Sequence, residues 1–389
     1  MIYTLLLKAR PQLKGWHWQV SALIWLALVS PAKALELRVA ITEGASQVKV
    51  GSSTQAQIQD SAGQTLGTMA AMNGFYARST GQGITVAHQQ ASQIWIEPTA
   101  AGLVYIGDRW YRGRTKLVKT GQGLTVINYV DLEDYLASVI GREMYSNWPQ
   151  EALKAQAVAS RSYALHQRQQ RGNKVFDVGD TTAWQVYDGI AGESTSTRSA
   201  VAATASQVLT YNSKVIEAVF HSSSGGHTEN CENVWSSPLP YLRGVPDYDQ
   251  TSPVYQWVTN FTAHDLSQRV SGVGNVTALL PLSHTPQGRV RKIKVVGDRG
   301  QRTISGNTLR SVLGLKSTLF LVTPQFDLLA TTGKTASKPV AFQVSGRGFG
   351  HGLGMSQWGA FGQAQQGRTY DQILLHYYQG ATLSQMQVQ

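Results

Sequence analysis

The apolar residues of this chain change their spacing near residue 131, and this change restricts the folds open to it. From Leu35 to about Ile127, apolar and polar residues alternate in short runs such as ELRVAI, QVKV, SQIWIEP, GLVYIG and GLTVINYV. Such alternation is typical of β-strands with one buried face. From Asp131 to about Gln169 the apolar residues recur every three or four positions, which predicts two helices. The sequence therefore predicts an α+β fold, with a β-rich region over residues 35–127 followed by a helix pair.

The remaining chain, residues 128–389, is expected to form a second region that mixes strands, helices and glycine-rich loops. Strands are predicted at VRKIKVVG, QRTISG and VAFQVSG, and helices at NTLRSVLGL, MSQWGAFGQAQQ and YDQILLHYYQ. An insertion is expected at about residues 250–285. The glycine-rich loop GRGFGHGLG and the C-terminal helices are expected to complete a groove beside the helix pair.

The first 34 residues have the layout of a secretory signal peptide. Lys8, Arg10 and Lys14 precede an apolar run from about Val20 to Val29, and a small-residue cleavage site ends at Ala34. This run of about ten residues is well short of the roughly 20 that a membrane helix needs. We therefore expect an exported protein of the periplasm or cell wall that meets the membrane only through its signal peptide.

Composition and charge limit the partners of such a chain. Its 42% hydrophobic and 15% charged residues are typical of a folded protein, and its 34 Lys and Arg outnumber its 23 Asp and Glu. The chain stays basic without the predicted leader, which holds four basic residues and no acid. For an exported protein, anionic envelope polymers are the expected partners and nucleic acid is not. Cys231 is the only cysteine, so no intrachain disulfide can form.

Glu143 is an acidic residue on the apolar stripe of the first predicted helix. Asp131 is a suitable N-cap, and apolar residues follow at positions 132, 135, 136, 139 and 140, so the next position on the stripe is 143. Burial and the negative end of the helix dipole would both raise the pKa of this carboxyl, as a general acid requires. Alternatively, Glu143 forms an ion pair with Arg142 or Arg161 that ties the two helices together.

Several blocks, taken in order, give the chain a resemblance to a known family. They are LEDYLASVIGREM (132–144), WPQEALKAQAVASRSYAL (148–165), WQVYDG (184–189), FHSSSGGHTE (220–229), LRSVLGLKST (309–318), GRGFGHGLGMSQWGA (346–360) and ILLHYYQGATL (373–383). In these blocks the chain resembles the sporulation stage II protein D family, also called SpoIID/LytB. That family contains peptidoglycan lytic transglycosylases and proteins described as amidase enhancers.

The resemblance implies cleavage of the β-1,4 bond after N-acetylmuramic acid, with Glu143 as the catalytic residue. Glycoside hydrolysis normally takes two carboxylates. A lytic transglycosylase needs only one, because the sugar's own 6-hydroxyl attacks and closes a 1,6-anhydro ring, and no cofactor is required. The alternative is a non-catalytic wall-binding protein that stimulates an N-acetylmuramoyl-L-alanine amidase. The expected partners are therefore peptidoglycan glycan strands and a wall amidase.

Further candidate residues come from the same blocks. The residues expected to bind substrate are Arg161, Gln185, Tyr187, His221, Ser222, Ser224, Gly225, His351, Gln357 and Trp358. The GRGFGHGLG loop follows a strand and precedes a helix, as dinucleotide-binding loops do. Too few residues follow it for a second strand with an acidic ribose ligand. We therefore expect its glycines either to bring backbone N–H groups close to a sugar chain or to allow a tight buried turn.

The stretch HSSSGGHTENC contains side chains that can bind zinc. His221, His227 and Cys231 are the candidate ligands, and some members of the family bind zinc in this region. The spacing is not that of a zinc finger, and a closed site takes four ligands. The alternative is a polar turn over residues 222–226 that lines the groove, with His221 hydrogen-bonded to sugar.

Overall fold

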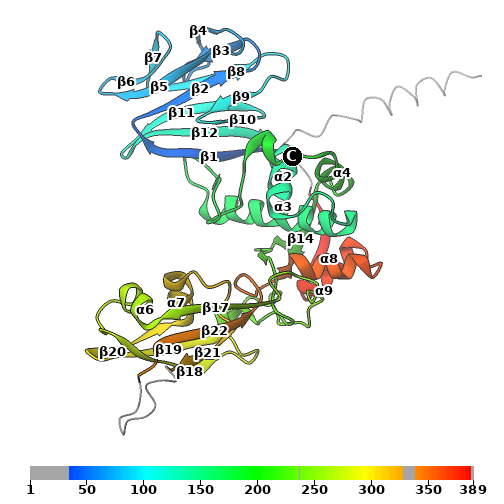
Figure 1. The fold of residues 1–389 in the computed structure, drawn as a ribbon. Coiled ribbons are helices and arrows are strands. Elements are labelled where there is room, and N and C mark those ends of the chain that lie inside the picture. The colour runs from blue at the N-terminus through cyan, green and yellow to red at the C-terminus, as the bar shows by residue number, and fades with distance from the viewer. Residues whose placement is uncertain (1–34, 236, 327–337, 387–389) are drawn as a thin grey trace, which may run out of the picture. The chain divides into compact units, whose positions relative to one another are not determined.

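The N-terminal strands form two sheets in the computed structural model, which describes residues 35–235, 237–326 and 338–386 (Figure 1). The seven-stranded sheet has the order β13-β1-β12-β11-β8-β3-β4. Its strands are β1 (Glu36–Ala45), β3 (Ala56–Gln59), β4 (Thr65–Met69), β8 (Gln93–Pro98), β11 (Arg114–Thr120), β12 (Gly123–Asp131) and β13 (Val178–Gly179). The predicted signal peptide, residues 1–34, lies outside the described residues.

The six-stranded sheet has the order β10-β9-β2-β5-β6-β7. Its strands are β2 (Gln47–Ser52), β5 (Gly74–Thr80), β6 (Gly83–Val86), β7 (Gln89–Ala91), β9 (Val104–Ile106) and β10 (Arg109–Tyr111). The alternation in the sequence explains the packing, since in β8 Ile94 and Ile96 are buried whereas Trp95 between them is partly exposed. The predicted strands in this region are confirmed.

The predicted helix pair is α2 (Leu132–Glu143) and α3 (Gln150–Arg171). Asp131 caps α2, because its Oδ1 accepts hydrogen bonds from the backbone N–H groups of Glu133 at 2.8 Å and Asp134 at 3.3 Å. Strand β12 continues past the predicted boundary at residue 127 and pairs with β1 as far as Asp131. Strand β13 also pairs with β1, in parallel. The chain after residue 127 therefore shares a sheet with the N-terminal region.

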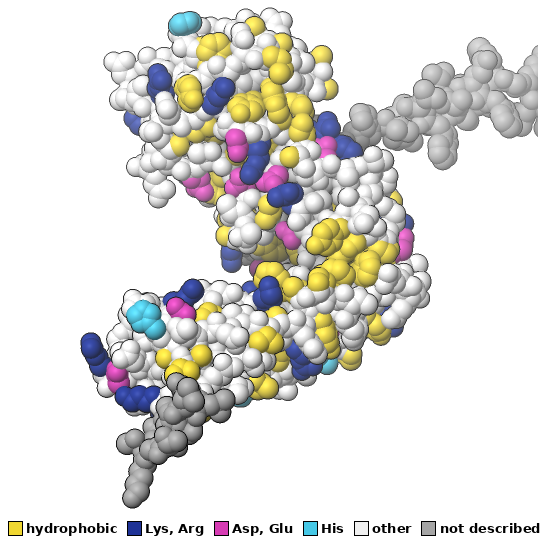
Figure 2. All heavy atoms as spheres, viewed as in Figure 1, with side chains coloured by type: hydrophobic (Ala, Val, Ile, Leu, Met, Phe, Trp, Pro, Cys, Tyr) yellow, Lys and Arg dark blue, Asp and Glu magenta, His cyan; other side chains and the backbone are white. Residues whose placement is uncertain are grey.

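Ion pairs also join the N-terminal strands to the helices that follow. Arg112, which precedes β11, contacts Glu193 at 2.9 Å and Asp134 of α2 at 3.7 Å. Arg198 of α4 (Thr195–Ala203) contacts the same Glu193 at 2.5 Å. Figure 2 shows basic and acidic side chains interspersed in this region. Both arginines are partly exposed, so the pairs contribute little stability singly and act as a network.

After α3, two small sheets join segments that lie far apart in the sequence. β14 (Gln207–Tyr211) pairs with β15 (Lys214–Val215) and β24 (Thr382–Gln385), and β16 (Phe220–His221) pairs in parallel with β23 (Met355–Ser356). The remaining helices here are η1 (Gly189–Gly192), α5 (Cys231–Val234), α8 (Gln357–Gln365) and α9 (Tyr370–Tyr377). Helices α8 and α9 both pack on α3. The β16–β23 pair places two sequence blocks more than 130 residues apart next to each other.

Residues 256–347, here called the inserted segment, have a hydrophobic core of their own. Their elements are β17 (Gln256–Thr262), α6 (Ala263–Arg269), β18 (Val276–His284), β19 (Val290–Gly297), β20 (Gly300–Ser305), α7 (Gly306–Leu313), β21 (Phe320–Gln325) and β22 (Ala341–Arg347). The sheets β17-β22-β21 and β18-β19-β20 bury Leu266, Ile293, Leu309 and Phe342. The predicted insertion, about 250–285, covers the first part of this segment, and the later strands and α7 complete the core.

The predicted α+β class is confirmed. The strands and helices predicted from the later blocks also appear, since VRKIKVVG is β19 and NTLRSVLGL covers all of α7 except its first residue. Among the described residues, no helix combines the length and the apolar character needed to cross a membrane.

Candidate active site

Glu143 is the last residue of α2, and its carboxyl group is largely surrounded by protein. The predicted apolar stripe is buried, including Val139 and Ile140 one turn earlier. Burial raises the pKa of Glu143 above its ordinary value. Two hydrogen bonds to the carboxylate oppose this shift, one from the Gln357 amide to Oε2 at 3.2 Å and one from the Val186 backbone N–H.

The alternative interpretation, in which Glu143 ties the two helices together through an arginine, is wrong. Arg142 contacts Asp188 at 2.7 Å instead. Arg161 is fully buried and forms a two-point ion pair with Glu133, at 2.9 and 2.5 Å. Neither arginine neutralises Glu143, so its carboxyl keeps a raised pKa.

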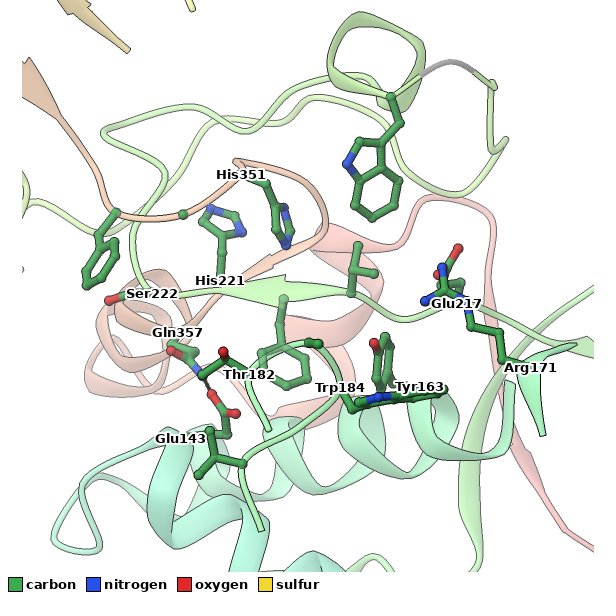
Figure 3. Close-up of a pocket in the computed structure, with 17 residues that line it drawn as sticks. Glu143, Tyr163, Arg171, Thr182, Trp184, Glu217, His221, Ser222, His351 and Gln357 are labelled. Atoms are coloured by element: carbon green, nitrogen blue, oxygen red, sulfur yellow. Dashed lines mark hydrogen bonds between the residues drawn. The ribbon is translucent and has the colours of Figure 1, made fainter. Parts of the chain in front are cut away.

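Glu143 lines an open pocket of about 470 Å³. Figure 3 shows Glu143 beside Gln357 at one end, and Arg171 with Glu217 at the other. Of the residues predicted from the sequence, the pocket brings together Glu143, His221, Ser222, His351 and Gln357. They come from α2, β16 and the residue after it, the glycine-rich loop and α8, so the predicted blocks do converge.

The glycine-rich loop positions His221 by close backbone approach. Ser223 and Phe349 form an isolated β-bridge between the two loops, just beyond the β16–β23 pair. Gly350 has φ +124°, and a Cβ there would lie 2.5 Å from the Cβ of His221. Only glycine satisfies both the backbone angle and the contact. Gly350 therefore has the second of the two roles expected for these glycines, which is to allow a tight turn against a neighbouring segment.

His221 and His351 form a neutral pair, with ring centroids 5.2 Å apart. Burial lowers the pKa of His221 well below its usual range and lowers that of His351 to about 4. His221 Nδ1 lies 3.0 Å from the Leu353 carbonyl oxygen, so in the neutral ring Nδ1 donates and Nε2 is the acceptor. This Nε2 is buried without a hydrogen-bond partner in the described chain. Protein encloses this acceptor, although His221 itself lines the pocket.

Three predicted substrate-binding residues are buried away from the pocket and hold the fold together. Arg161 forms an ion pair with Glu133. Gln185 accepts a hydrogen bond from Tyr135 at 3.3 Å, and the Tyr187 hydroxyl donates to Asn128 at 2.8 Å. None of the three lines the pocket of Glu143, because their polar groups bind other protein atoms in the interior.

The serine-rich turn is divided between the pocket and the interior. Ser222 lines the pocket. The hydroxyl of Ser224 donates to Asp247 at 2.5 Å, and the Gly225 N–H donates to Asp249 at 2.8 Å, both in the interior. Ser224 and Gly225 are therefore structural residues here, because the buried carboxylates take up their donors.

Trp358 packs in an aromatic cluster outside the pocket lining. Its ring centroid lies 4.7 Å from Trp148, 5.4 Å from Phe361 and 6.5 Å from Tyr145. Tyr145, two residues after Glu143, is 64% exposed. The predicted contact between Trp358 and substrate stays a prediction, and this cluster is the surface on which it would occur.

The candidate zinc ligands do not assemble. Cys231 is buried in α5, and His227 Nδ1 lies 2.7 Å from the carbonyl oxygen of its neighbour Thr228. Over residues 35–235, 237–326 and 338–386, no three His, Cys, Asp or Glu side chains are grouped so that they could hold a metal ion. The structure therefore does not bring the predicted ligands His221, His227 and Cys231 together, because the three side chains lie in different surroundings.

Several pocket residues were missed by reasoning from sequence. They are Tyr163, Arg171, Trp235 and Glu217. Trp235 ends the polar stretch that holds the histidines, so an aromatic beside such a turn was the available signal. Glu217 lies three residues before β16 and had no distinguishing signal. It adds a second carboxylate to the pocket, at the end opposite Glu143 (Figure 3).

Comparison with known proteins decides the family. The family model "Stage II sporulation protein" matches residues 120–211, which include α2 and α3. Stage II sporulation protein D of Bacillus subtilis (strain 168) is 35% identical over 284 residues, which cover 67% of this chain and 76% of that protein. The chain belongs to the stage II sporulation protein D family. The predicted resemblance is confirmed.

Other relatives of this SpoIID-family protein differ in their names. An uncharacterized protein of Brachyspira hyodysenteriae is 32% identical over 278 residues, covering 70% of this chain and 72% of that protein. An amidase enhancer of Bacillus subtilis is 34% identical over 291 residues, covering 64% of this chain and 40% of the relative. Residues 240–354, which contain the inserted segment, match a second model described as "Domain of unknown function (DUF8618)".

Proposed function

We propose that this SpoIID-family protein is a peptidoglycan lytic transglycosylase. It would cleave the β-1,4 bond between N-acetylmuramic acid and N-acetylglucosamine and leave a 1,6-anhydro end. The observation that carries the proposal is the carboxyl of Glu143, which has a raised pKa, no arginine partner and a place on an open pocket.

One carboxyl group is enough for the proposed reaction. Protonated Glu143 donates its proton to the glycosidic oxygen as the bond from that oxygen to C1 of the muramic acid breaks. The resulting carboxylate then accepts the proton of the C6 hydroxyl, whose oxygen bonds to C1 and closes the ring. Burial favours the proton in the first step, and the Gln357 and Val186 donors stabilise the carboxylate formed.

The pocket walls suit a sugar chain. Tyr163, Trp184 and Trp235 offer aromatic faces on which sugar rings can pack, and Ser222 offers a hydroxyl group for hydrogen bonds to the sugar. We propose that the protein is exported and acts on glycan strands of the wall, in agreement with the predicted signal peptide.

The test is Glu143→Gln, which keeps the shape and removes the titrating proton. We expect a rate loss of roughly 10²–10⁴-fold in the release of 1,6-anhydro-muropeptides from purified sacculi, measured by mass spectrometry. Glu217→Gln is the matched control, because it neutralises the other pocket carboxylate. Its rate should stay within a few-fold of the parent. Equal release by Glu143→Gln and the parent would refute the proposal.

Glu217 also allows hydrolysis to be tested, because hydrolases use two carboxylates. If both glutamine variants lost activity and the product ends were reducing sugars without the anhydro ring, the protein would be a hydrolase. The position of Glu217 at the opposite end of the pocket argues against this (Figure 3).

The second candidate function is non-catalytic enhancement of an N-acetylmuramoyl-L-alanine amidase, favoured by the relative named amidase enhancer. The same Glu143→Gln variant separates the two functions. An enhancer would stimulate a purified wall amidase equally well with or without this carboxyl, and would release no anhydro product by itself.

A further inference from the structure

A second pocket, of about 260 Å³, adjoins the pocket of Glu143. Trp235 lines both, so the two share a wall. We call the second one the arginine pocket, because Arg289 and Arg291 of the inserted segment line it together with Ser305 and Asn307. All of its lining residues are described, and none is acidic. The chemistry assigned to Glu143 does not use it.

Arg289 is a buried cation whose hydrogen-bonding capacity is only partly used. It is 1% exposed, and its Nη2 donates to the Ser224 carbonyl at 2.7 Å. Its Nε and Nη1 have no hydrogen-bond partner among the described residues. Burial lowers the pKa of Arg289 only to about 10, so it stays charged at neutral pH. Buried charged donors without hydrogen-bond partners are costly, so an anion that reached Nε and Nη1 would stabilise this side chain.

Among the described residues, the carboxylates of Glu229 and Asp249 attract Arg289 through space but accept no hydrogen bond from it. Glu229 accepts hydrogen bonds from the Thr285 hydroxyl, from the Gln287 backbone N–H at 3.1 Å and from the Asn233 amide at 3.2 Å. Asp249 accepts from Ser223 and Gly225 through one of its oxygens. The positive character of the pocket rests on its own lining, which contains Arg289 and Arg291 and no carboxylate.

Two further features of the inserted segment add to the positive potential. Ser305 and Asn307 belong to the N-terminal end of α7, where the helix dipole favours anions and Ser305 caps the helix by accepting a hydrogen bond from the Thr308 N–H at 2.9 Å. Gly306 lets this end lie against β19, because a Cβ there would meet the Val290 carbonyl oxygen at 1.9 Å.

A β-bulge places Arg291 at the same pocket. In the β18–β19 ladder Lys292 pairs with Ser283 and Val290 pairs with His284, so β19 contains one extra residue, Arg291. Bulges re-aim side chains and are frequent next to functional sites. The buried Arg289, the N-terminal end of α7 and the bulged Arg291 therefore all contribute to the same pocket.

We propose that the arginine pocket binds a carboxylate of the peptidoglycan strand whose sugars occupy the pocket of Glu143. Arginine recognises carboxylates by paired hydrogen bonds, and the shared Trp235 wall allows one strand to reach both pockets. Peptidoglycan carries such groups on the free lactyl side chain of muramic acid and on its stem peptides. The inference rests on the proposed function only for the choice of glycan as the source.

The test compares two tetrasaccharides of alternating N-acetylglucosamine and N-acetylmuramic acid, one with free lactyl carboxylates and one with these carboxylates converted to neutral amides. Binding is measured by calorimetry to full-length Glu143→Gln protein, so that no strand is cleaved. We expect the free acid to bind about tenfold more tightly. Adding Arg291→Gln should remove this difference. Lys292→Gln removes the same charge from the adjacent exposed position, which does not line the pocket, and should retain the difference.

Two further probes identify the source of the anion. A tetrasaccharide with stem peptides that binds as tightly as the free acid, in an Arg291-dependent way, would support the proposal and assign the carboxylate to the peptide. Arg291-dependent binding of inorganic phosphate, with no preference between acid and amide glycans, would reveal a free-anion site and overturn it.

The proposal is also overturned if the acid glycan shows no binding, if acid and amide bind equally, or if Arg291→Gln and Lys292→Gln weaken binding equally. Cleavage by the unsubstituted protein is followed separately. A lack of anhydro product there would refute the proposed reaction and leave the binding comparison standing.

Discussion

Two opposing effects act on the pKa of the Glu143 carboxyl. Burial raises the pKa of its carboxyl, and the donors Gln357 and Val186 lower it, with burial the larger effect. The folded protein therefore favours the protonated form more than the unfolded chain does. His221 and His351 are neutral at neutral pH, since burial lowers both their pKa values.

This balance predicts how activity depends on pH. Because Glu143 must begin protonated, kcat/KM should decrease as the pH rises through the raised pKa of Glu143. His351, with a pKa of about 4, should contribute no change between pH 6 and 8. Initial rates on purified glycan strands over this range would check it. A rate that increases steadily with pH would contradict the role of Glu143 as the acid.

The same pKa shift predicts a stability difference. A carboxyl whose pKa is raised by folding stabilises the fold fully below its unfolded pKa, and this contribution is lost as the pH rises through the folded pKa. Glu143→Gln should therefore unfold at a higher urea concentration than the parent at pH 7. Near pH 4 the two midpoints should converge. If the urea midpoints of Glu143→Gln and the parent differed by the same amount at both pH values, the substitution would act through packing instead of through the pKa.

At the scale of elements, α2 and α3 are joined by the ion pair between Glu133 and Arg161. Arg161 is fully buried and also donates to the Gln207 carbonyl at 3.0 Å, which connects β14 to the helix pair. Removing one partner of a buried pair leaves an uncompensated charge, and this costs more than the pair itself contributes.

Glu133→Ala should therefore lower the free energy of unfolding by about 3 kcal/mol. The control is Glu232→Ala, which breaks the partly exposed pair of Glu232 and Arg243 and should cost about 0.5 kcal/mol. Urea unfolding followed by circular dichroism measures both. Similar small losses in the two variants would show that Arg161 finds another partner.

At the scale of the whole molecule, the chain has separate cores in the N-terminal sheets and in the inserted segment. Residues Gln256 and Arg347 pair where the inserted segment begins and ends. The segment's core includes Leu309 of α7, which is fully buried. The arginine pocket lies where this segment meets α5.

Separate cores predict local unfolding. Leu309→Ala should destabilise the inserted segment by about 2–5 kcal/mol, because it leaves a cavity. Hydrogen exchange followed by mass spectrometry should then show faster exchange over residues 256–347 and unchanged exchange in β11 and β12. Ile94→Ala, in the core of the N-terminal sheets, should give the reverse pattern. Loss of protection in both regions from either variant would mean that the cores unfold together.

The sequence by itself determined the N-terminal strands, the helix pair and the inward position of Glu143. These depend on apolar period and on the Asp131 cap, which act between residues close in the chain. Family blocks also indicated His221, His351 and Gln357. Only the tertiary structure decided which side chains reach the pocket. Gln357 meets Glu143 across 214 residues, whereas Arg161 is bound by Glu133 and Ser224 by Asp247. Such partners depend on how distant segments pack, and local periodicity carries no information about that.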